Sequence, residues 1–291
     1  RVLGGSSSLN GMVFVRGNAR DYDGWVEAGA PSWSYAECLP YFKRMETFSE
    51  GRNDYRGGDG PLHVTRCKAD NPLYQAFLRA GQDAGLPFSE DHNGRQQEGV
   101  NIAQATVHRG ERESTSRAFL APVMGRENLA IVTGALATGL VLSGNRAIGV
   151  DCLVNGEKRS FEAEREVILS AGAFGSPQLL MLSGIGDGAE LRAHGIAVRQ
   201  NLLGVGKSLQ DHVAVPIQYR TTKPVSPARN LGKLGRLAVG LRWMAARSGL
   251  GASNYFEVGA FLRGNDQVAW PNLQHEFFPM IGEFYRGEAK V

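Results

Sequence analysis

The sequence has no hydrophobic run that approaches the roughly 18 residues of a membrane span, so we expect no transmembrane helix. It also lacks a dense block of lysine and arginine, and its formal net charge of +3 disfavours nucleic acid as a partner. Cysteine is scarce, because only Cys38, Cys67 and Cys152 occur. Three distant cysteines provide neither a disulfide framework nor a zinc site, and they fit a reducing, cytoplasmic location.

Several catalytic signatures are missing as well. No serine lies in a G-x-S-x-G turn, no P-loop is present, and the six histidines show no H-E-x-x-H spacing, so we expect no metal site. Gly184, Gly186 and Ala189 match the spacing of the dinucleotide fingerprint, but residues 177–183 before them read as a helix. Because that fingerprint must follow a strand, we reject it here.

Glycine is the residue in excess, at 38 of 291 positions, or about 13% against a usual ~7%. The chain opens inside one of the glycine clusters: residues 1–8 read RVLGGSSS, with no initiator methionine. We therefore interpret the sequence as an internal piece of a longer chain, and we expect an α/β fold of mixed helices and strands.

Local patterns predict the elements of this fold. Caps and apolar spacing predict five helices: 34–46, with Pro40 as a probable kink, 71–85, 176–183, 187–195 and 231–248. Period-two patterns predict strands at 129–132, 167–171, 255–263 and 272–279. The dipeptides Gly144-Asn145 and Asn155-Gly156 predict two hairpin turns.

Two glycine-containing turns could each hold a phosphorylated ligand. The loop of residues 4–8 precedes an apolar stretch and offers close backbone approach, although a flexible surface loop would read the same way. The strand predicted at 167–171 runs through Ala171 into Gly172 and a helix, where open α/β sheets bind ligands. An ordinary strand-to-helix turn is the alternative there.

Two further segments also admit a plain and a functional interpretation. In residues 254–257, Asn-Tyr-Phe-Glu, a carboxylate stands beside aromatic rings that could hold a cationic ligand, or it could be a surface glutamate at a strand end. The helix predicted at 231–248 is amphipathic and basic, which fits a membrane surface or ordinary packing with a solvated basic face.

Two long motifs in this order resemble the signatures of the glucose-methanol-choline (GMC) oxidoreductase family. Residues 1–10, RVLGGSSSLN, are similar to the first signature, and residues 172–186, GAFGSPQLLMLSGIG, to the second. Residues 204–212, GVGKSLQDH, resemble a further family stretch. The resemblance implies part of a Rossmann-like FAD-binding domain, formed by 1–61 and 99–211. It also implies a β-sheet substrate-binding domain, formed by 62–98 and 212–291.

The same resemblance implies FAD as the cofactor and assigns residues to it. These cofactor residues are Leu3, Gly4, Gly5, Ser6, Asn10, Gly11, Met12, Val13, Leu136, Ala171 and Gly172. Asn10 to Val13 would lie nearest the flavin ring, and Leu136 would meet the adenine end. Some relatives attach the flavin through a histidine where this chain has Leu9, so we expect non-covalent FAD.

Residues 53–61 and 251–257 resemble most closely the choline-oxidising members of the family. This implies oxidation of a primary alcohol by hydride transfer to the flavin, from choline to betaine aldehyde, with Glu257, Tyr255 and Phe256 binding the substrate. An uncharged alcohol, or a non-catalytic assembly role, remains an alternative. The resemblance places the catalytic histidine beyond Val291, so we expect no turnover from this chain alone. It leaves the electron acceptor and peripheral membrane association open.

Overall fold

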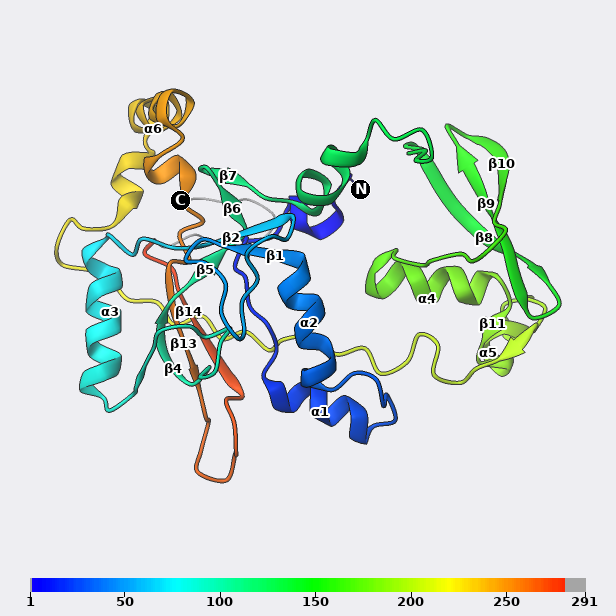
Figure 1. The fold of residues 1–291 in the computed structure, drawn as a ribbon, viewed down its shortest axis with the longest axis horizontal. Helices are drawn as coiled ribbons and strands as arrows, with labels where there is room; N and C mark the ends of the chain where they lie inside the picture. Colours follow the sequence, from blue (N-terminus) through cyan, green and yellow to red (C-terminus); the bar gives the residue numbers. More distant parts are fainter. Residues whose placement is uncertain (1, 281–291) are drawn as a thin grey trace. The chain divides into compact units, whose positions relative to one another are not determined.

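The computed structural model describes residues 2–280 (Figure 1). The chain forms two compact units, the first made of residues 1–126 and 218–291 and the second of residues 127–217. The mixture of helices and strands confirms the predicted fold class. The division into cofactor and substrate domains concerns ligands, and it stays a prediction.

Small sheets organise the first unit. Its strands are β1 (Glu46–Phe48), β2 (Leu62–Arg66), β3 (Phe88–Ser89), β4 (Gly99–Ile102), β5 (Gln104–Ala105), β6 (Val107–His108), β7 (Glu111–Arg112), β13 (Val258–Leu262) and β14 (Leu273–Phe277). One sheet has the order β1-β2-β5 and another the order β14-β13-β4-β3. Strands β6 and β7 form a separate hairpin. Strand β13 pairs antiparallel with both of its neighbours, whereas β3 and β4 are parallel.

Four α-helices complete the described part of this unit: α1 (Ala19–Glu27), α2 (Tyr35–Met45), α3 (Pro72–Asp83) and α6 (Lys233–Ala246). Their first turns follow local chemistry. The Ser34 side chain accepts a hydrogen bond from the backbone N–H of Glu37, and the Glu37 carboxylate accepts one from Ser34. Asn71 caps α3 ahead of Pro72, as predicted. Helix α2 runs through Pro40 to Met45.

Short helical turns link these elements. They are η1 (Gly5–Ser8), η2 (Ser116–Leu120), η3 (Ala121–Val123), η4 (Pro227–Leu231) and η5 (Gly249–Ala252).

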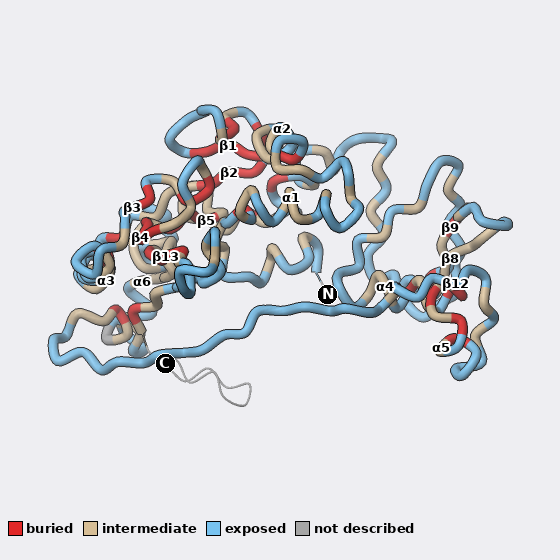
Figure 2. Tube along the Cα trace, turned by 90° about the horizontal axis from the view of Figure 1, so that it is seen from below, coloured by how far each residue is buried: buried red, intermediate tan, exposed pale blue. Residues whose placement is uncertain are grey.

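The main core of the first unit lies between α3 and the four-stranded sheet. Its buried members are Ala69, Tyr74, Leu78, Val100, Val258 and Ala260. A second cluster, of Phe48, Leu62, Val64 and Ala118, lies on the other sheet. Figure 2 shows buried residues on these strands and a long exposed segment, residues 206–224. The core therefore fixes β4 and β13, the strands that frame the candidate site.

The second unit is built on a meander of three antiparallel strands. Its strands are β8 (Ala135–Ser143), β9 (Arg146–Val154), β10 (Glu157–Glu162), β11 (Ile185–Gly186) and β12 (Gln200–Asn201). Both predicted hairpin turns are confirmed, because they fall between β8, β9 and β10. Helices α4 (Gly172–Leu182) and α5 (Gly188–Ala193) follow the meander. Helix α4 contacts β8, where Ser183 Oγ accepts from the backbone N–H of Leu140.

Three predictions for this unit are wrong. Residues 129–132 and 167–171 are not strands, because neither stretch pairs with another strand in the described part of the chain. An apolar period of two supplies the face of a strand but not the partner that completes its hydrogen bonds. Helix α4 begins at Gly172 rather than Ser176 and accommodates Pro177 within it. Helix α4 confirms that residues 177–182 are helical, which removes the strand that the apparent fingerprint would need.

Candidate cofactor and substrate site

The predicted cofactor residues of the first unit lie on one loop, residues 3–13, which we call the cofactor loop. Two serines form hydrogen bonds within the loop. Ser7 Oγ donates to the carbonyl of Gly4, and Ser8 Oγ donates to the carbonyl of Leu3 at 2.8 Å. The backbone N–H of Thr115 donates to Ser7 Oγ at 2.9 Å. These bonds fix the loop from within and leave its outer residues exposed.

A single arginine holds the middle of the cofactor loop. Arg112, on β7, donates through Nη1 to the carbonyl of Asn10 at 2.7 Å and to its Oδ1 at 2.9 Å. The same nitrogen lies 3.2 Å from the carbonyl of Ser7. Asn10 Oδ1 also accepts from the backbone N–H of Met12 at 3.1 Å. Arg112 therefore holds the turn that presents Asn10 to Val13.

The predicted substrate segment packs directly on this loop, although the two are about 240 residues apart. Asn254 is buried, and its Nδ2 donates to the carbonyl of Gly11 at 3.0 Å. A side chain at Gly11 would lie 3.6 Å from the ring of Phe256. The backbone N–H of Thr106 donates to the carbonyl of Met12 at 2.9 Å. The structure thus brings Gly11, Met12 and residues 254–256 into one site.

Glu257 is half-buried, and hydrogen bonds hold both of its oxygens. Oε2 accepts from the backbone N–H of Ala69 at 2.7 Å, and Oε1 accepts from Ser253 Oγ. Burial, followed by the charge of Glu257, raises the pKa of Cys67 to about 12 and also raises that of Tyr255. The carboxylate therefore has a fixed position and acts electrostatically on its neighbours.

Glu257 and Tyr255 line a cavity of about 720 Å³. The same cavity is lined by Arg242 and Arg247, from the end of α6 and the turn that follows it. Tyr255 has a left-handed backbone, with φ of 63°, which costs a non-glycine residue about 1–3 kcal/mol. Phe256 lies against the cofactor loop and is not among the residues that line this cavity.

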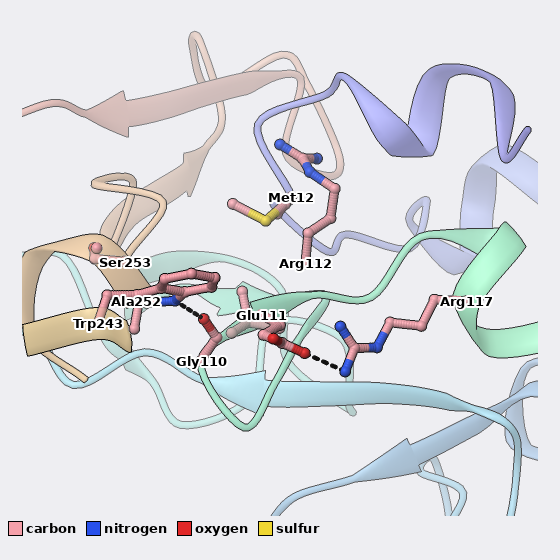
Figure 3. A pocket seen from close by; sticks show the side chains of 10 residues that line it. Met12, Gly110, Glu111, Arg112, Arg117, Trp243, Ala252 and Ser253 are labelled. Carbon is pink, nitrogen blue, oxygen red and sulfur yellow. Dashed lines mark hydrogen bonds and ion pairs between the residues drawn. The ribbon is translucent and has the colours of Figure 1, made fainter. Parts of the chain in front are cut away.

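A second cavity, of about 340 Å³, adjoins Met12 of the cofactor loop (Figure 3). Trp243 Nε1 donates to the carbonyl of Gly110 at 2.7 Å along one wall. Glu111 forms ion pairs with both Arg117 and Arg247, so its charge is already balanced. Met12 also has a positive φ, of 60°. Backbone strain of this kind is concentrated at ligand sites, which supports Met12 as part of one.

A buried ion cluster supports the chain just beyond the cofactor loop. Glu46 and Arg56 are fully buried and form a two-point ion pair, and Arg16 lies 2.7 Å from the same carboxylate. Asp91 pairs with Arg56 at 2.9 Å. Burial alone would raise the pKa of Asp91, but Arg56 and a hydrogen bond from Gln104 bring it below its ordinary value. The cluster fixes where the chain leaves the loop.

The remaining predicted cofactor residues lie in the second unit. Leu136 is an exposed residue of β8. Ala171 precedes α4, and its backbone N–H donates to Ser176 Oγ at 3.0 Å. Gly172 has a φ of 86°, with open space where a side chain would begin. A shared cofactor site for these residues and the cofactor loop stays a prediction.

The cofactor loop has the features that close contact with a nucleotide requires. Leu3, Gly5, Ser6, Asn10 and Gly11 are exposed on it. Gly5 has a φ of 55° and nothing within 4 Å of the position of a Cβ, so backbone can approach a ligand there. The residues present therefore fit a flavin dinucleotide. Among the described residues, no three or more His, Cys, Asp or Glu side chains lie together so that they could bind a metal ion.

Sequence reasoning missed Arg112 and Trp243, whose backbone partners lie more than 100 positions away in the chain. Ser253 and Asn254 were part of a recognised motif, but their bonds to Glu257 and Gly11 were not foreseen. No helix in residues 2–280 is long and apolar enough to cross a membrane.

Comparison with known proteins agrees with these features. Residues 1–214 match the family described as GMC oxidoreductase. The chain is 50% identical to the oxygen-dependent choline dehydrogenase of Photobacterium profundum, over 99% of this chain and 51% of that protein. It is 47% identical to the mitochondrial choline dehydrogenase of Mus musculus, over 96% of this chain and 47% of that protein. The chain thus spans about half the length of these relatives.

Solved structures show the same fold. A formate oxidase from Aspergillus oryzae, described in terms of its FAD modification, superposes with a TM-score of 0.86 at 28% identity. That match covers 96% of this chain and 54% of the oxidase. A pyridoxine 4-oxidase, 36% identical, gives a TM-score of 0.64 over 67% of this chain and 39% of the other. With a family match over residues 1–214, the chain belongs to the GMC oxidoreductase family.

Proposed function

We propose that the whole protein is an FAD-dependent oxidoreductase that oxidises the CH–OH group of a primary alcohol, with choline as its substrate. The observation that carries the proposal is the packing of residues 254–257 on the cofactor loop. Asn254 donates to the carbonyl of Gly11, in the loop that would face the flavin, and the fixed carboxylate of Glu257 follows three residues after Asn254.

FAD would be held without a covalent bond. The outer backbone of Leu3 to Ser6 would contact the pyrophosphate, and Asn10 to Val13 would lie nearest the ring, held there by Arg112 and Asn254. Leu136, Ala171 and Gly172 would complete the site. Leu9 stands where some relatives carry the linking histidine, and leucine has no nucleophile. We therefore expect denaturation and filtration to release the flavin from the protein.

When bound, FAD supplies an acceptor for a hydride from the carbinol carbon. This chain would contribute orientation and charge. Glu257 would face the cationic end of the substrate, and Tyr255 would line the same cavity with an aromatic face. The two hydrogen bonds to Glu257 keep the carboxylate from moving as the substrate binds.

One observation favours an uncharged alcohol as a second candidate. Five basic residues line the same cavity as Glu257, namely Arg66, Lys68, Arg109, Arg242 and Arg247, and Asp70 is the only other carboxylate among its lining residues. Arg66 and Arg247 have acidic partners, Glu50 and Glu111, which reduces their repulsion of a cation. The two candidates therefore differ in whether the carboxylate of Glu257 acts on the charge of the substrate.

The discriminating experiment compares choline with 3,3-dimethylbutan-1-ol, its uncharged isostere, in the whole enzyme. Glu257→Gln is expected to lower kcat/KM for choline by about 10- to 100-fold, because losing one partner of a desolvated charge pair costs roughly 2 kcal/mol or more. The value for the isostere should change much less. Asp70→Asn, which removes the exposed carboxylate of the same cavity, is the matched control and should preserve the preference.

An equal loss for both alcohols would mean that Glu257 supports the structure of the site rather than the charge of the substrate. A Glu257→Gln enzyme that retains full selectivity for choline would exclude the cation site.

A further inference from the structure

Two residues next to Glu257 have backbone conformations that a side chain disfavours. Ala69, whose N–H donates to Glu257 Oε2, has a φ of 53° although it is completely buried. Tyr255, two residues before Glu257, has a φ of 63°. Such residues persist only where the surrounding structure holds them, and they are concentrated at functional sites. The contacts that hold Ala69 and Tyr255 therefore bear on the position of the Glu257 carboxylate.

The first turn of helix α3 supplies a contact to each of them. Tyr74 Oη donates to the carbonyl of Tyr255 at 2.9 Å, and Gln75 Nε2 donates to the carbonyl of Ala69 at 3.0 Å. Tyr74 is 4% exposed and belongs to the main core of the first unit, so its hydroxyl has a fixed position. Figure 1 shows α3 beside the strands of that core. Two adjacent side chains thus hold the two strained residues next to Glu257.

Each strained residue is connected to one oxygen of the carboxylate. Ala69 donates to Oε2 directly. The backbone N–H of Tyr255 donates at 2.9 Å to Ser253 Oγ, which in turn donates to Oε1. The carbonyl of Glu257 accepts from the N–H of Ala103 at 2.9 Å, so its backbone is anchored next to β4. A shift of Ala69 or Tyr255 would therefore move the donors of the carboxylate while the backbone of Glu257 stays in place.

We propose that Tyr74 and Gln75 are positioning residues that set the preference of this site for a cationic alcohol by holding the Glu257 carboxylate. The inference rests on the proposed function, in which Glu257 faces the cationic end of the substrate. A carboxylate that moves away attracts a cation more weakly, whereas an uncharged alcohol of the same shape does not sense its charge. Tyr74 also lines the cavity, but its hydroxyl is bonded to Tyr255.

Steady-state kinetics of the whole enzyme with choline and 3,3-dimethylbutan-1-ol test this. Tyr74→Phe removes only the hydroxyl and is expected to lower kcat/KM for choline about fivefold, the effect of losing one hydrogen bond. The value for the uncharged alcohol should change much less. Gln75→Ala should lower the choline value about twofold, because Gln75 is exposed and water replaces its bond more easily.

A double-mutant cycle separates positioning from direct contact. Once Glu257→Gln is present, Tyr74→Phe should not lower the ratio of kcat/KM for choline to that for the uncharged alcohol any further. Additive effects on this ratio would overturn the proposal, because the hydroxyl would then act without the carboxylate.

Two variants on the same helix serve as controls. Gln82→Ala removes an exposed glutamine of the last turn, whose side chain forms no hydrogen bond that the described residues show. Leu78→Val removes a methylene group from the same core. Both should keep the ratio of the parent enzyme. A ratio that falls in Leu78→Val as it does in Tyr74→Phe would overturn the proposal, because it would report loss of packing.

Amide hydrogen exchange provides a readout without substrate. Exchange in residues 67–70 and 253–257 should rise in Tyr74→Phe and Gln75→Ala but not in Gln82→Ala. Unchanged exchange, together with an unchanged ratio, would mean that α3 does not hold the carboxylate. Failure of the proposed function would look different, since Glu257→Gln itself would then leave the ratio unchanged.

Discussion

His92 is one of the most completely enclosed polar side chains in the first unit, with 3% of its surface exposed. Its Nε2 lies 3.2 Å from the carbonyl of Phe14, directly after the cofactor loop, and its ring stacks on Phe261. Burial is the main cause that lowers the pKa of His92 to about 4, against an ordinary value of 6.5. Between pH 6.5 and about 4, therefore, the folded chain keeps this ring neutral while the unfolded chain protonates it.

This difference predicts how stability depends on pH. Between pH 6.5 and about 4 the unfolded state binds more protons at His92, so stability is full above that window and falls as the pH is lowered through it. A shift of this size corresponds to a loss of about 3 kcal/mol. Urea unfolding at a series of pH values measures the loss.

His92→Gln should reduce the slope in that window, because glutamine keeps a polar group but does not titrate. The contribution of Asp91 should remain in the variant, since its lowered pKa affects stability only at more acidic pH. Identical slopes for the parent and the variant would show that His92 does not titrate as its burial implies.

Single residues show what a motif can and cannot indicate. Motifs mark Glu257 and the cofactor loop, and the structure brings Asn254, three residues before Glu257, into contact with that loop. The ligand roles of these residues stay predictions. The role of Arg112 was not foreseen, because its partners lie 102 and 105 positions earlier in the chain. No short-range pattern encodes a pairing at that distance.

Among the elements, the helices were predicted best because their start signals are local. The Ser34 capping box and the Asn71-Pro72 start are present as expected, and α6 lies within the predicted 231–248. The hairpins of the second unit were also predicted, since glycine and asparagine specify their turns. The strands predicted at 129–132 and 167–171 are absent, because a strand requires a hydrogen-bonding partner as well as an apolar pattern.

Strand β7 positions the cofactor loop, because it carries Arg112, whose side chain donates to two carbonyls of that loop. Arg112→Ala removes bonds to Ser7 and Asn10 and should destabilise the chain by about 1–3 kcal/mol, because hydrogen bonds to charged groups are the stronger ones. Amide hydrogen exchange should rise in residues 7–12 and stay unchanged in α3.

Arg79→Ala is the control, since Arg79 is exposed on α3 and forms no hydrogen bond or ion pair that the described residues show. Arg112→Lys should restore part of the protection because it keeps one donor. Unchanged exchange in the cofactor loop of Arg112→Ala would mean that the serine bonds alone hold it.

For the whole molecule, the notable feature is the segment 206–224, which is exposed throughout and contains no helix or strand. It includes position 217, where the second unit ends and the first resumes. Backbone that is exposed and has no regular hydrogen bonding is where proteases cut first. Limited trypsin digestion should therefore cleave initially after Lys207 or Arg220, as mass spectrometry of the fragments would show.

Lys223 should resist cleavage, because Pro224 follows it. Fragments of about 1–207 and 221–291 should appear before any cut after Arg79, which lies in α3 beside the core. Early cleavage at Arg79 would mean that the core of the first unit opens more readily than the segment.

The hydrogen bond from Asn254 to Gly11 has a thermodynamic consequence. It joins two stretches to which the proposed function assigns ligands, one ending at Glu257 and the other at Met12. A ligand that orders one stretch also restricts the other, so the protein loses less conformational entropy when a second ligand binds there. Such coupling is reciprocal: the factor by which the first ligand tightens the second is the factor by which the second tightens the first. An alcohol bound at Glu257 would therefore tighten the binding of a flavin at Gly11, and the flavin would tighten the binding of the alcohol by the same factor.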